Sequence, residues 1–520
     1  MDRLTVFSKL VGGLLIVGII IGALYYLGKN PDVAEKIAPT GNPTATGGAG
    51  KESKAARGEK LIVGINTWGG FAGAVYYNGG FKASKSSKFY TEYGQLVEFK
   101  LIDDFNASRE AWKSGDIDVL GFCTIDAFTT EINGLKQFDP QVIGQIDWSR
   151  GGDAIVVRRG INQVSDLKGK KIAVAPMTPS HTLLLWLMDA GEVGWGDVTI
   201  IPVSNGIDAA DLFKKQQVDA AVVWSPDDQD CVAKIEGSKV LVSTKKASHI
   251  IADVWLATKS TVENKNDALR AFVEGTMKGN GAINSDPGVK KEAATLLAEG
   301  FNQPLDFCMT AINNARLATL GDNQDFFDVN GNFGGVTGEK LYMKMAQSFA
   351  RTKDNQGQYY ITGGVPPWRT VAYPAFIRSS KIAGADQASE EGARFTAPTP
   401  ELATVTPIST KKVTIEFASG SSALTDDARN KIDTDFLDLA KGFRDARIRI
   451  EGNTDNVGSY EMNKALSRKR AQAVADYLNK WFGRNRFVVL GNGPDKPVAD
   501  NDTPEGRQRN RRTDFELLGQ

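Results

Sequence analysis

Between residues 60 and 378, short apolar runs alternate with longer segments in which apolar residues recur at helical spacing. The apolar runs include KLIVGIN, IDVLGFC, DAIVVR and VDAAVVW. Runs of this length predict buried strands, and their alternation with helices is typical of an α/β fold with mostly parallel sheets. The region is long enough for two lobes rather than one.

The end of the chain, residues 411–520, follows a different pattern. It predicts an α+β unit with strands at Val413 to Phe417, Arg447 to Glu451, Phe487 to Leu490 and Thr513 to Leu517, and with helices beginning at Asp426 and at about Ser459. The last connection, PVADNDTPEGRQRN, is rich in Pro, Asp and Gly, as a surface loop should be.

Two segments of low complexity separate these units from the rest of the chain. Residues 29–59 contain NPTATGGAG, and residues 379–410 contain ARFTAPTPELATVTPIST. Both compositions predict flexible or extended linkers. Before the first linker, Leu10 to Leu27 forms an uncharged apolar run that is just long enough to span a bilayer. We therefore expect a single transmembrane helix at residues 10–28.

The orientation and fate of this helix follow from its flanks. Arg3 and Lys9 would keep residues 1–9 in the cytoplasm and place everything after the helix in the periplasm. A cleaved signal peptide is the alternative, but no small-x-small site follows the apolar run. Gly18 and Gly22 form a GxxxG pair through which two copies could associate, although this pattern also occurs without function.

Composition excludes several classes of function. Lys plus Arg equals Asp plus Glu at 62 each, so we expect no nucleic-acid partner. The only two histidines, His181 and His249, lie in no HExxH or nucleophile-elbow context, and no Gly-rich phosphate loop is present. We therefore expect a protein that is not an enzyme and that has no cofactor and no metal site.

The C-terminal unit resembles a known family. The segments VTIEFASGSSAL, EGNTDNVGSYEMNKALSRKRAQAVADYL and GNGPDKPVADNDTPEGRQRNRRTDFEL match the OmpA-like peptidoglycan-binding domain in order and spacing. The resemblance implies that Asp455 and Arg470 grip the diaminopimelate of the stem peptide, a role that suits a carboxylate facing an ammonium and a guanidinium facing a carboxylate. It also implies nearby roles for Asn463, Thr454 and Arg512. Taken alone, the Asp455 and Arg470 pair would more often be an ordinary surface ion pair.

This chain departs from the family pattern at two places. It has FASGSS where many members have an acidic turn, and Asn453 replaces the commoner His before Thr-Asp. These departures concern the affinity and the contacts rather than the domain itself.

The middle region resembles a second family. VSDLKGKKIAVAPMTPSHTLLLWLMDAGEV and DVTIIPVSNGIDAADLFKKQQVDAAVVWSPD are similar to type II periplasmic solute-binding proteins of the nitrate, sulfonate, taurine and thiamine-precursor branch. The resemblance implies two lobes with a ligand cleft between them, and a second lobe at about 151–253. It implies a cleft lined by Trp68, Gly69, Thr124, Asp126, Thr178, Ser180, His181, Trp224, Asp227 and Asp253.

The sign of the ligand's charge stays open at this point. Helix N-termini at such clefts favour anionic groups, whereas three of the expected lining residues are Asp, which would repel a simple oxyanion. Each residue also has a plain structural interpretation: His181 as a helix-start residue, Trp224 as a core aromatic and Asp126 as an N-cap.

Together the sequence predicts a two-lobed α/β binding-protein fold, an α+β OmpA-like domain and one N-terminal membrane helix. The expected function is that of a bacterial inner-membrane protein, single-pass and mostly periplasmic, which binds peptidoglycan and a small unidentified solute as a tethered receptor, sensor or scaffold. Inner-membrane proteins are expected as further partners. Two alternatives remain: a wall-anchoring, stator-like structural subunit with a ligand-free middle domain, and the receptor of an ABC importer. The predicted membrane helix carries no carboxylate, which argues against this chain conducting protons itself.

Overall fold

The computed structural model describes residues 59–519, apart from residues 122, 128–133, 393, 419 and 484. The predicted membrane helix at Leu10 to Leu27, its Gly18 and Gly22 pair, and nearly all of the first predicted linker lie outside these residues. None of the described helices is both long and apolar enough to cross a membrane.

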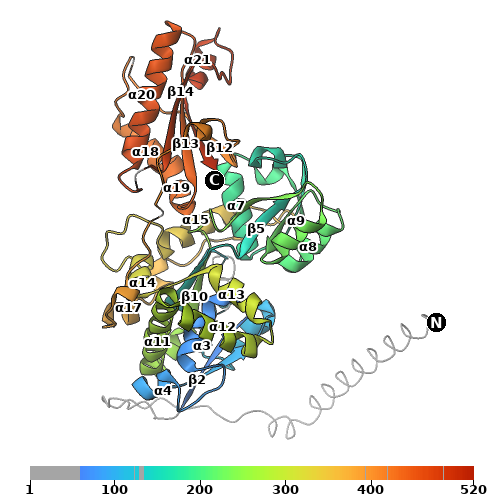
Figure 1. Cartoon of the computed structure of the whole chain (residues 1–520), viewed down its shortest axis with the longest axis vertical. Coiled ribbons are helices and arrows are strands. Elements are labelled where there is room, and N and C mark those ends of the chain that lie inside the picture. The colour runs from blue at the N-terminus through green and yellow to red at the C-terminus, as the bar shows by residue number, and fades with distance from the viewer. Residues whose placement is uncertain are drawn as a thin grey trace, which may run out of the picture. The chain divides into compact units, whose positions relative to one another are not determined.

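A six-stranded sheet forms the first lobe of the middle region (Figure 1). In spatial order its strands are β11 (Ala315–Leu317), β4 (Pro140–Ser149), β10 (Ala252–Thr258), β3 (Val119–Leu120), β1 (Lys60–Ile65) and β2 (Leu96–Leu101). β1 is parallel to β2 and β3, whereas β10 is antiparallel to β3 and β4. β4 and β10 are buried along almost their whole length, as expected for strands covered on both faces.

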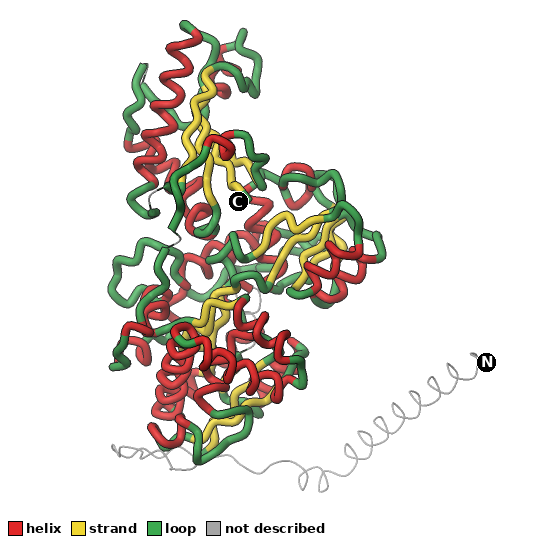
Figure 2. Tube along the Cα trace, in the orientation of Figure 1, coloured by secondary structure: helices red, strands yellow, loops and turns green. Residues whose placement is uncertain are grey.

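Helices pack around this sheet (Figure 2). They are η1 (Gly69–Phe71), α3 (Ala72–Asn78), α4 (Lys88–Tyr93), α5 (Phe105–Ser114), η2 (Lys136–Phe138), α10 (Lys259–Asn264), α11 (Asn266–Ser285), α12 (Pro287–Phe301) and α13 (Leu305–Asn313). α11 runs against α3, where Gly73 and Gly279 let the two backbones meet.

A five-stranded sheet forms the second lobe. In spatial order its strands are β7 (Thr199–Pro202), β6 (Lys171–Val174), β8 (Ala220–Trp224), β5 (Asp153–Val157) and β9 (Lys239–Ser243). Its helices are η3 (Val164–Leu167), α7 (Pro179–Ala190), η4 (Trp195–Asp197), α8 (Gly206–Lys214) and α9 (Asp227–Lys234). The chain crosses between the two lobes twice, at residues 150–152 and at residues 244–251. Polar residues near these crossings therefore lie where the lobes meet.

A C-terminal extension of the middle region returns to the first lobe. It contains α14 (Leu320–Phe326), α15 (Gly338–Arg351), α16 (Trp368–Val371), α17 (Ala375–Ser379) and η5 (Ala385–Gln387). Gln387 is buried and donates to the carbonyl of Met277, and the amide of Glu390 donates to Asp322. These bonds satisfy buried backbone groups. Part of the segment 379–410, predicted as a flexible linker, is therefore packed against the first lobe.

A four-stranded sheet forms the C-terminal domain. In spatial order its strands are β12 (Ser409–Val413), β15 (Thr513–Leu518), β13 (Arg447–Asn453) and β14 (Phe487–Gly493). Its helices are η6 (Pro400–Ala403), α18 (Asp426–Ile432), the π-helical turn η7 (Asp433–Leu437), α19 (Asp438–Gly442), α20 (Tyr460–Leu478) and α21 (Pro504–Asn510). The first predicted strand is displaced: it was expected at Val413 to Phe417, whereas Val413 is the last residue of β12. The reason is pairing, because Ser409 to Val413 bond to β15 in register with Leu517 to Thr513.

The two faces of β13 have different environments. Ile448 and Ile450 are fully buried in the apolar core, while Arg449 on the other face donates to the carbonyls of Leu402, Ala403 and Val405 and to Glu516. A buried guanidinium is tolerated only when its donors are satisfied. Arg449 thus fixes the segment that enters the domain against its sheet.

Candidate functional sites: a wall-binding pair and a buried carboxylate cluster

Close packing of α20 on the C-terminal sheet positions the first site. A Cβ on Gly452 of β13 would overlap the carbonyl oxygen of Ser467, and one on Gly491 of β14 would lie 2.5 Å from the backbone nitrogen of Arg468. Glycine at these two positions lets the helix approach the strands at backbone distance. Arg470, less than one turn beyond Ser467, is thereby brought towards the loop that begins at Asp455.

Asp455 lies in the loop between β13 and α20 and is largely buried. Its Oδ1 accepts a hydrogen bond from the backbone N–H of Val457 at 3.1 Å. Its Oδ2 accepts one from Nη1 of Arg511 at 2.6 Å. Asn463 supports the same loop, because its Nδ2 donates to the carbonyl of Val457 at 3.0 Å. The carboxylate is therefore held at a fixed position by its own loop.

Arg470 reaches the same place from α20. Its Nε donates to the carbonyl of Ser421 at 3.1 Å, and its guanidinium lies 4.8 Å from the ring centre of Phe417. Burial, followed by the charge of Arg511, lowers the pKa of Arg470, while Asp455 opposes this effect. Within the described part of the chain, its two Nη groups have no hydrogen-bond partner. Phe417 and Ser421 belong to the FASGSS segment, so this segment supplies a ring and a carbonyl to the arginine.

Two other residues predicted for this site, Arg512 and Thr454, have different partners in the structure. Arg512 is buried and bonds to both carboxylate oxygens of Asp514, at 2.9 and 2.8 Å, and to the carbonyl of Lys496. Thr454 is buried, and its amide donates to the carbonyl of Gly493. The arginine that faces Asp455 is Arg511, which the sequence analysis missed. Side-chain alternation next to β15 was the available signal, because Arg512 and Asp514 share a face and Arg511 takes the other.

The second site is a cluster of four carboxyl groups at the boundary of the two lobes, termed the carboxylate cluster here. It consists of Asp126, Asp147, Asp153 and Asp253, whose exposed fractions lie between 0% and 9%. Asp147 on β4 and Asp253 on β10 are directly paired in the sheet, and Thr124 forms a bridge with Asp253. Asp153 opens β5, just after the chain crosses to the second lobe.

Side chains from both lobes donate to this cluster. From the first lobe, Nε1 of Trp68 donates to Oδ2 of Asp147 at 2.9 Å. From the second lobe, Ser180 donates to Oδ1 of Asp153 at 3.3 Å, and Nε1 of Trp224 donates to Oγ of Ser180 at 3.0 Å. The backbone N–H of Ala252 donates to Asp126. The two tryptophans are half-buried, so each lobe places an indole beside the carboxyl groups.

Burial dominates the electrostatics of the cluster. It raises the pKa of Asp126, of Asp147 and of Asp153 to about 7 each. The pKa of Asp253 is raised well above its ordinary value, first by burial and then by repulsion from Asp147, Asp126 and Asp153. Like charges held together in a desolvated place retain protons or require a counter-charge.

Four predicted cleft residues have surroundings of their own. The ring of His181 is buried against Trp195, Tyr360 and Phe349, and burial lowers its pKa to about 3. Asp227 opens α9 near Lys214, at 3.8 Å. Gly69 packs against the backbone of α13, and Thr178 donates to the carbonyl of Ala175. His181 and Gly69 are thus packed against other parts of the protein, Asp227 lies in an ion pair, and Thr178 stands at the start of a helix.

Two members of the cluster, Asp147 and Asp153, were missed by the sequence analysis. Both stand in otherwise apolar strand sequences, GQIDW and GGDAIVV. An Asp inside a buried strand is unfavourable unless something compensates it, and that was the available signal.

Comparison with known proteins confirms both resemblances. Residues 416–511 match the model of the OmpA family, and residues 148–289 match the model described as NMT1/THI5 like. The peptidoglycan-binding protein ArfA of Mycobacterium tuberculosis is 39% identical over 103 residues, which are 18% of this chain and 32% of that protein. The match to outer membrane protein A of Bordetella avium is 45% over 69 residues, covering 13% of this chain and 36% of the relative. This chain thus spans about a third of the length of these relatives.

The middle region has its own relatives. The taurine-binding periplasmic protein of Escherichia coli is 24% identical over 211 residues, covering 40% of this chain and 63% of that protein. The solved structure of the aliphatic sulphonate binding protein SsuA from Escherichia coli is 18% identical, with a TM-score of 0.41, and the match covers 49% of this chain and 84% of that one. The chain is therefore a fusion of an NMT1/THI5-like solute-binding domain with a C-terminal OmpA-family domain.

Proposed function

We propose that this protein is a receptor tied to the cell wall: its C-terminal domain binds the diaminopimelate of peptidoglycan, and its middle domain captures a small solute where the two lobes meet. In this proposal Leu10 to Leu27 anchors the chain in the inner membrane, and the described residues work in the periplasm. The anchor rests on the apolar sequence alone.

The observation that carries the wall-binding half is the neighbourhood of Asp455 and Arg470. The loop holds the carboxylate, and Ser421 and Phe417 hold the guanidinium while its Nη groups face no partner within the described residues. A side chain that ends in both an ammonium and a carboxylate, as diaminopimelate does, matches this pair in charge and in donor geometry. The mycobacterial relative is named a peptidoglycan-binding protein, which agrees with this role.

Co-sedimentation with purified walls tests this half. The full chain should pellet with diaminopimelate-type peptidoglycan, and the double variant Asp455→Asn, Arg470→Gln should bind at least about 100-fold more weakly, because two charge-assisted hydrogen-bonding groups are lost. A matched control is Asp426→Asn with Arg429→Gln, which removes an exposed pair of the same two residue types from the start of α18. Walls with lysine in place of diaminopimelate lack the second carboxylate and should bind poorly. Equal pelleting of the double variant and the control would refute the assignment.

The receptor half rests on the union of the two domains and on the carboxylate cluster. A binding protein that is held at the wall binds its solute at a fixed place. It can therefore pass the signal only to a partner nearby, and it does not diffuse to a distant one. Purification of the full chain from its own cells, with mass spectrometry before and after denaturation, should release a discrete small molecule. If no molecule is released and multi-span membrane proteins co-purify instead, the structural-subunit alternative would replace the receptor.

A further inference from the structure

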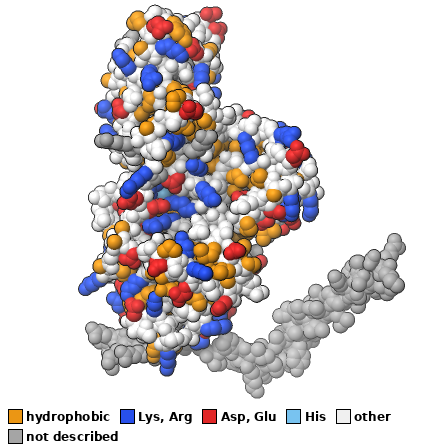
Figure 3. Space-filling model, in the orientation of Figure 1, with side chains coloured by type: hydrophobic (Ala, Val, Ile, Leu, Met, Phe, Trp, Pro, Cys, Tyr) orange, Lys and Arg blue, Asp and Glu red, His pale blue; other side chains and the backbone are white. Residues whose placement is uncertain are grey.

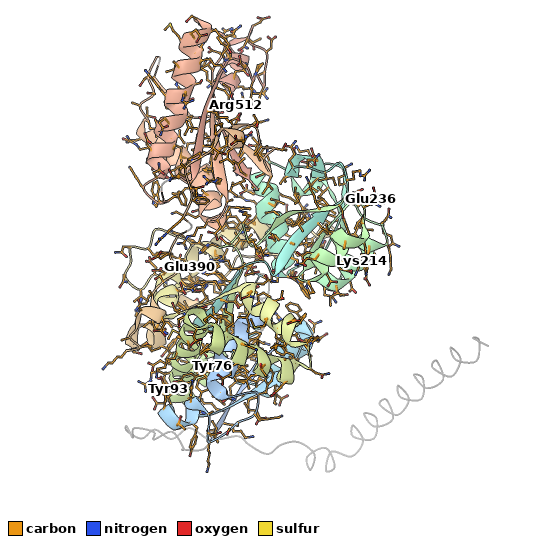
Figure 4. The ribbon with its side chains drawn as sticks, in the orientation of Figure 1. Tyr76, Tyr93, Lys214, Glu236, Glu390 and Arg512 are labelled. Atoms are coloured by element: carbon orange, nitrogen blue, oxygen red, sulfur yellow. The ribbon has the colours of Figure 1, made fainter. Side chains whose placement is uncertain are left out.

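Three of the four members of the carboxylate cluster are not neutralised by a cation within the described residues: Asp147, Asp153 and Asp253 form no ion pair with Lys or Arg there. Arg150 follows β4 and partly offsets the charge of Asp147, but its guanidinium is bound to Glu390, which lies in the segment after η5 (Figure 4). Buried carboxylates without a partner are costly and need a compensating group.

Two buried acceptors next to each other also lack donors. Within the described part of the chain, Oδ1 of Asp147 is fully buried and has no N–H or hydroxyl donor, so the neighbouring carboxyl group of Asp253 can satisfy it only by carrying a proton. Gln145, two residues earlier on β4, donates its Nε2 to the carbonyl of Asp147 at 3.2 Å, and its Oε1 is buried without a donor. Native structures rarely leave such acceptors unsatisfied. The side-chain amide of Gln145 is uncharged, so it gives evidence independent of the acidic side chains. Within the described residues, the acceptors beside Asp147 outnumber the hydrogen-bond donors.

The pairing of Asp147 with Asp253 increases the need for a proton or a cation at this site. The two residues stand opposite each other on adjacent antiparallel strands, where Cβ atoms lie about 5 Å apart. Two carboxyl groups at that separation are stable only if they share a proton or if a cation lies between them. Trp68 satisfies one oxygen of Asp147 and leaves the other to that proton or cation.

The start of α7, where a simple anion would be expected, is already occupied by a carboxylate. Ser180 in the first turn of α7 donates to Asp153, so a carboxyl group of the protein itself faces this helix N-terminus. Helix N-termini favour negative charge, and here the chain supplies it. A sulfonate or nitrate at the same place would meet Asp153 and the other three carboxyl groups.

We propose that the carboxylate cluster binds an organic cation, namely a small solute with a primary ammonium or a guanidinium that donates hydrogen bonds to Asp147, Asp253 and Gln145. This deepens, and rests on, the proposed receptor function. Trp68 of the first lobe and Trp224 of the second point their indole N–H groups at Asp147 and at Ser180, and both indoles are half-buried, so each lobe places an aromatic ring beside the proposed site. A bare metal ion is disfavoured, because the described residues contain no group of three or more His, Cys, Asp or Glu arranged to hold one.

The test is calorimetric titration of the full chain with matched small solutes. The cationic probes are ethanolamine, putrescine and agmatine, the anionic probes are isethionate, ethanesulfonate and nitrate, and Mg²⁺ and Ca²⁺ are added separately. The molecule released by denaturing protein from its own cells is identified in parallel. We expect a released molecule with a protonatable nitrogen, and binding of at least one cationic probe that Asp253→Asn weakens at least about tenfold, the effect of losing one charged hydrogen-bond partner.

The variants separate binding from folding. Asp253→Asn and Asp147→Asn remove repulsion inside the cluster, so each should raise the unfolding temperature of the solute-free protein while weakening cation binding. Glu236→Gln is the matched control, because its carboxylate is exposed and, among the described residues, its ion-pair partner is the exposed Arg159 of the second lobe. It should leave both quantities unchanged.

The outcomes distinguish the two proposals. Binding of an anionic probe alone, or release of an anion without a protonatable nitrogen, would overturn the organic cation and leave the receptor standing. Binding of Mg²⁺ or Ca²⁺ at the cluster would overturn it as well. If no molecule is released and no probe binds, the receptor function fails together with this inference, while wall binding is unaffected.

Discussion

Arg511 donates to Asp455 at 2.6 Å, whereas its neighbour Arg512 bonds to Asp514 on the opposite side of the chain. The two arginines are adjacent in sequence and differ in their environment. Arg511 is 45% exposed and Arg512 is 5% exposed. Asp455 is therefore already paired with a partly exposed cation, which the ammonium of diaminopimelate must displace or share in the proposed wall binding.

Replacing Arg511 should strengthen wall binding modestly. Arg511→Gln frees Asp455 from a competing cation, and partly exposed ion pairs contribute about 0.2–1 kcal/mol, so the affinity for diaminopimelate-type walls should rise by up to about fivefold. The measurement is a co-sedimentation isotherm at two salt concentrations. Weaker binding of Arg511→Gln would mean that Arg511 contacts the ligand directly.

Replacing Arg512 should act on folding instead. Arg512→Gln leaves the largely buried carboxylate of Asp514 without its cation, and breaking such a pair costs about 3–5 kcal/mol of unfolding free energy. Chemical denaturation of the full chain, followed by a probe of the C-terminal domain, should show this loss. Arg512→Gln protein that is still folded at low denaturant should pellet with walls as the natural chain does. Equal stability of the Arg511→Gln and Arg512→Gln variants would contradict the assignment.

The approach of α20 to the sheet should be needed for wall binding. In Gly452→Ala, the added methyl group would overlap the carbonyl oxygen of Ser467 and push α20 away from β13, which moves Arg470 relative to Asp455. We expect weaker wall binding together with a destabilisation of about 1–3 kcal/mol. Gly196→Ala is the control, because nothing lies within 4 Å of the added atom. Unaltered wall binding by Gly452→Ala would show that the close contact does not position the pair.

The sequence predicts the strands of this chain better than the polar residues between them. Apolar runs such as DAIVVR form strands because both faces of their sheet are covered. The segment KKVTIEF is ambiguous, since its alternation is compatible with several registers and only pairing with β15 selects Ser409–Val413. Short-range pattern cannot show which partner strand will set the register.

The two sites also differ in how far the sequence predicts them. Asp455 and Arg470 belong to a local motif whose spacing survives in sequence, so both were predicted. Asp147 and Asp253 meet only because β4 and β10 pair across more than a hundred residues of chain, and no local pattern reports that meeting. The surroundings of His181 were not predictable for the converse reason: it opens a helix beside Ser180, but its ring packs against Phe349, which is far away in the sequence.

The face of the molecule seen in Figure 3 shows no large region of one charge sign. Lys and Arg side chains are intermingled with Asp and Glu over the face seen in Figure 3. The four carboxyl groups of the carboxylate cluster are buried instead. Charge buried in the folded state makes stability depend on pH, and that dependence can be measured without knowing the ligand.

Asp153 should make the solute-free protein less stable as pH rises towards neutrality. Burial holds the pKa of Asp153 at about 7 in the folded chain against an ordinary value of 3.8. Between these two values the folded state binds a proton that the unfolded state has lost, so stability falls as pH rises from about 4 to about 7 and is level above. Asp126 and Asp147 share this behaviour and Asp253 reinforces it, while the positive charge of Arg150 beside Asp147 reduces it.

The variant Asp153→Asn isolates this effect. Its amide keeps hydrogen-bonding partners in Ser180 and Ser149, whose hydroxyl groups can donate or accept. The two buried histidines, His181 and His249, have lowered pKa values and would destabilise the protein on acidification, but they are the same in both proteins and cancel in the difference. Relative to Asp153→Asn, the natural chain should therefore gain at least about 1 kcal/mol of unfolding free energy between pH 8 and pH 5. Denaturant titrations at both pH values measure this difference. A difference that is constant with pH would show that Asp153 is ionised throughout, and hence that the cluster already has a counter-charge.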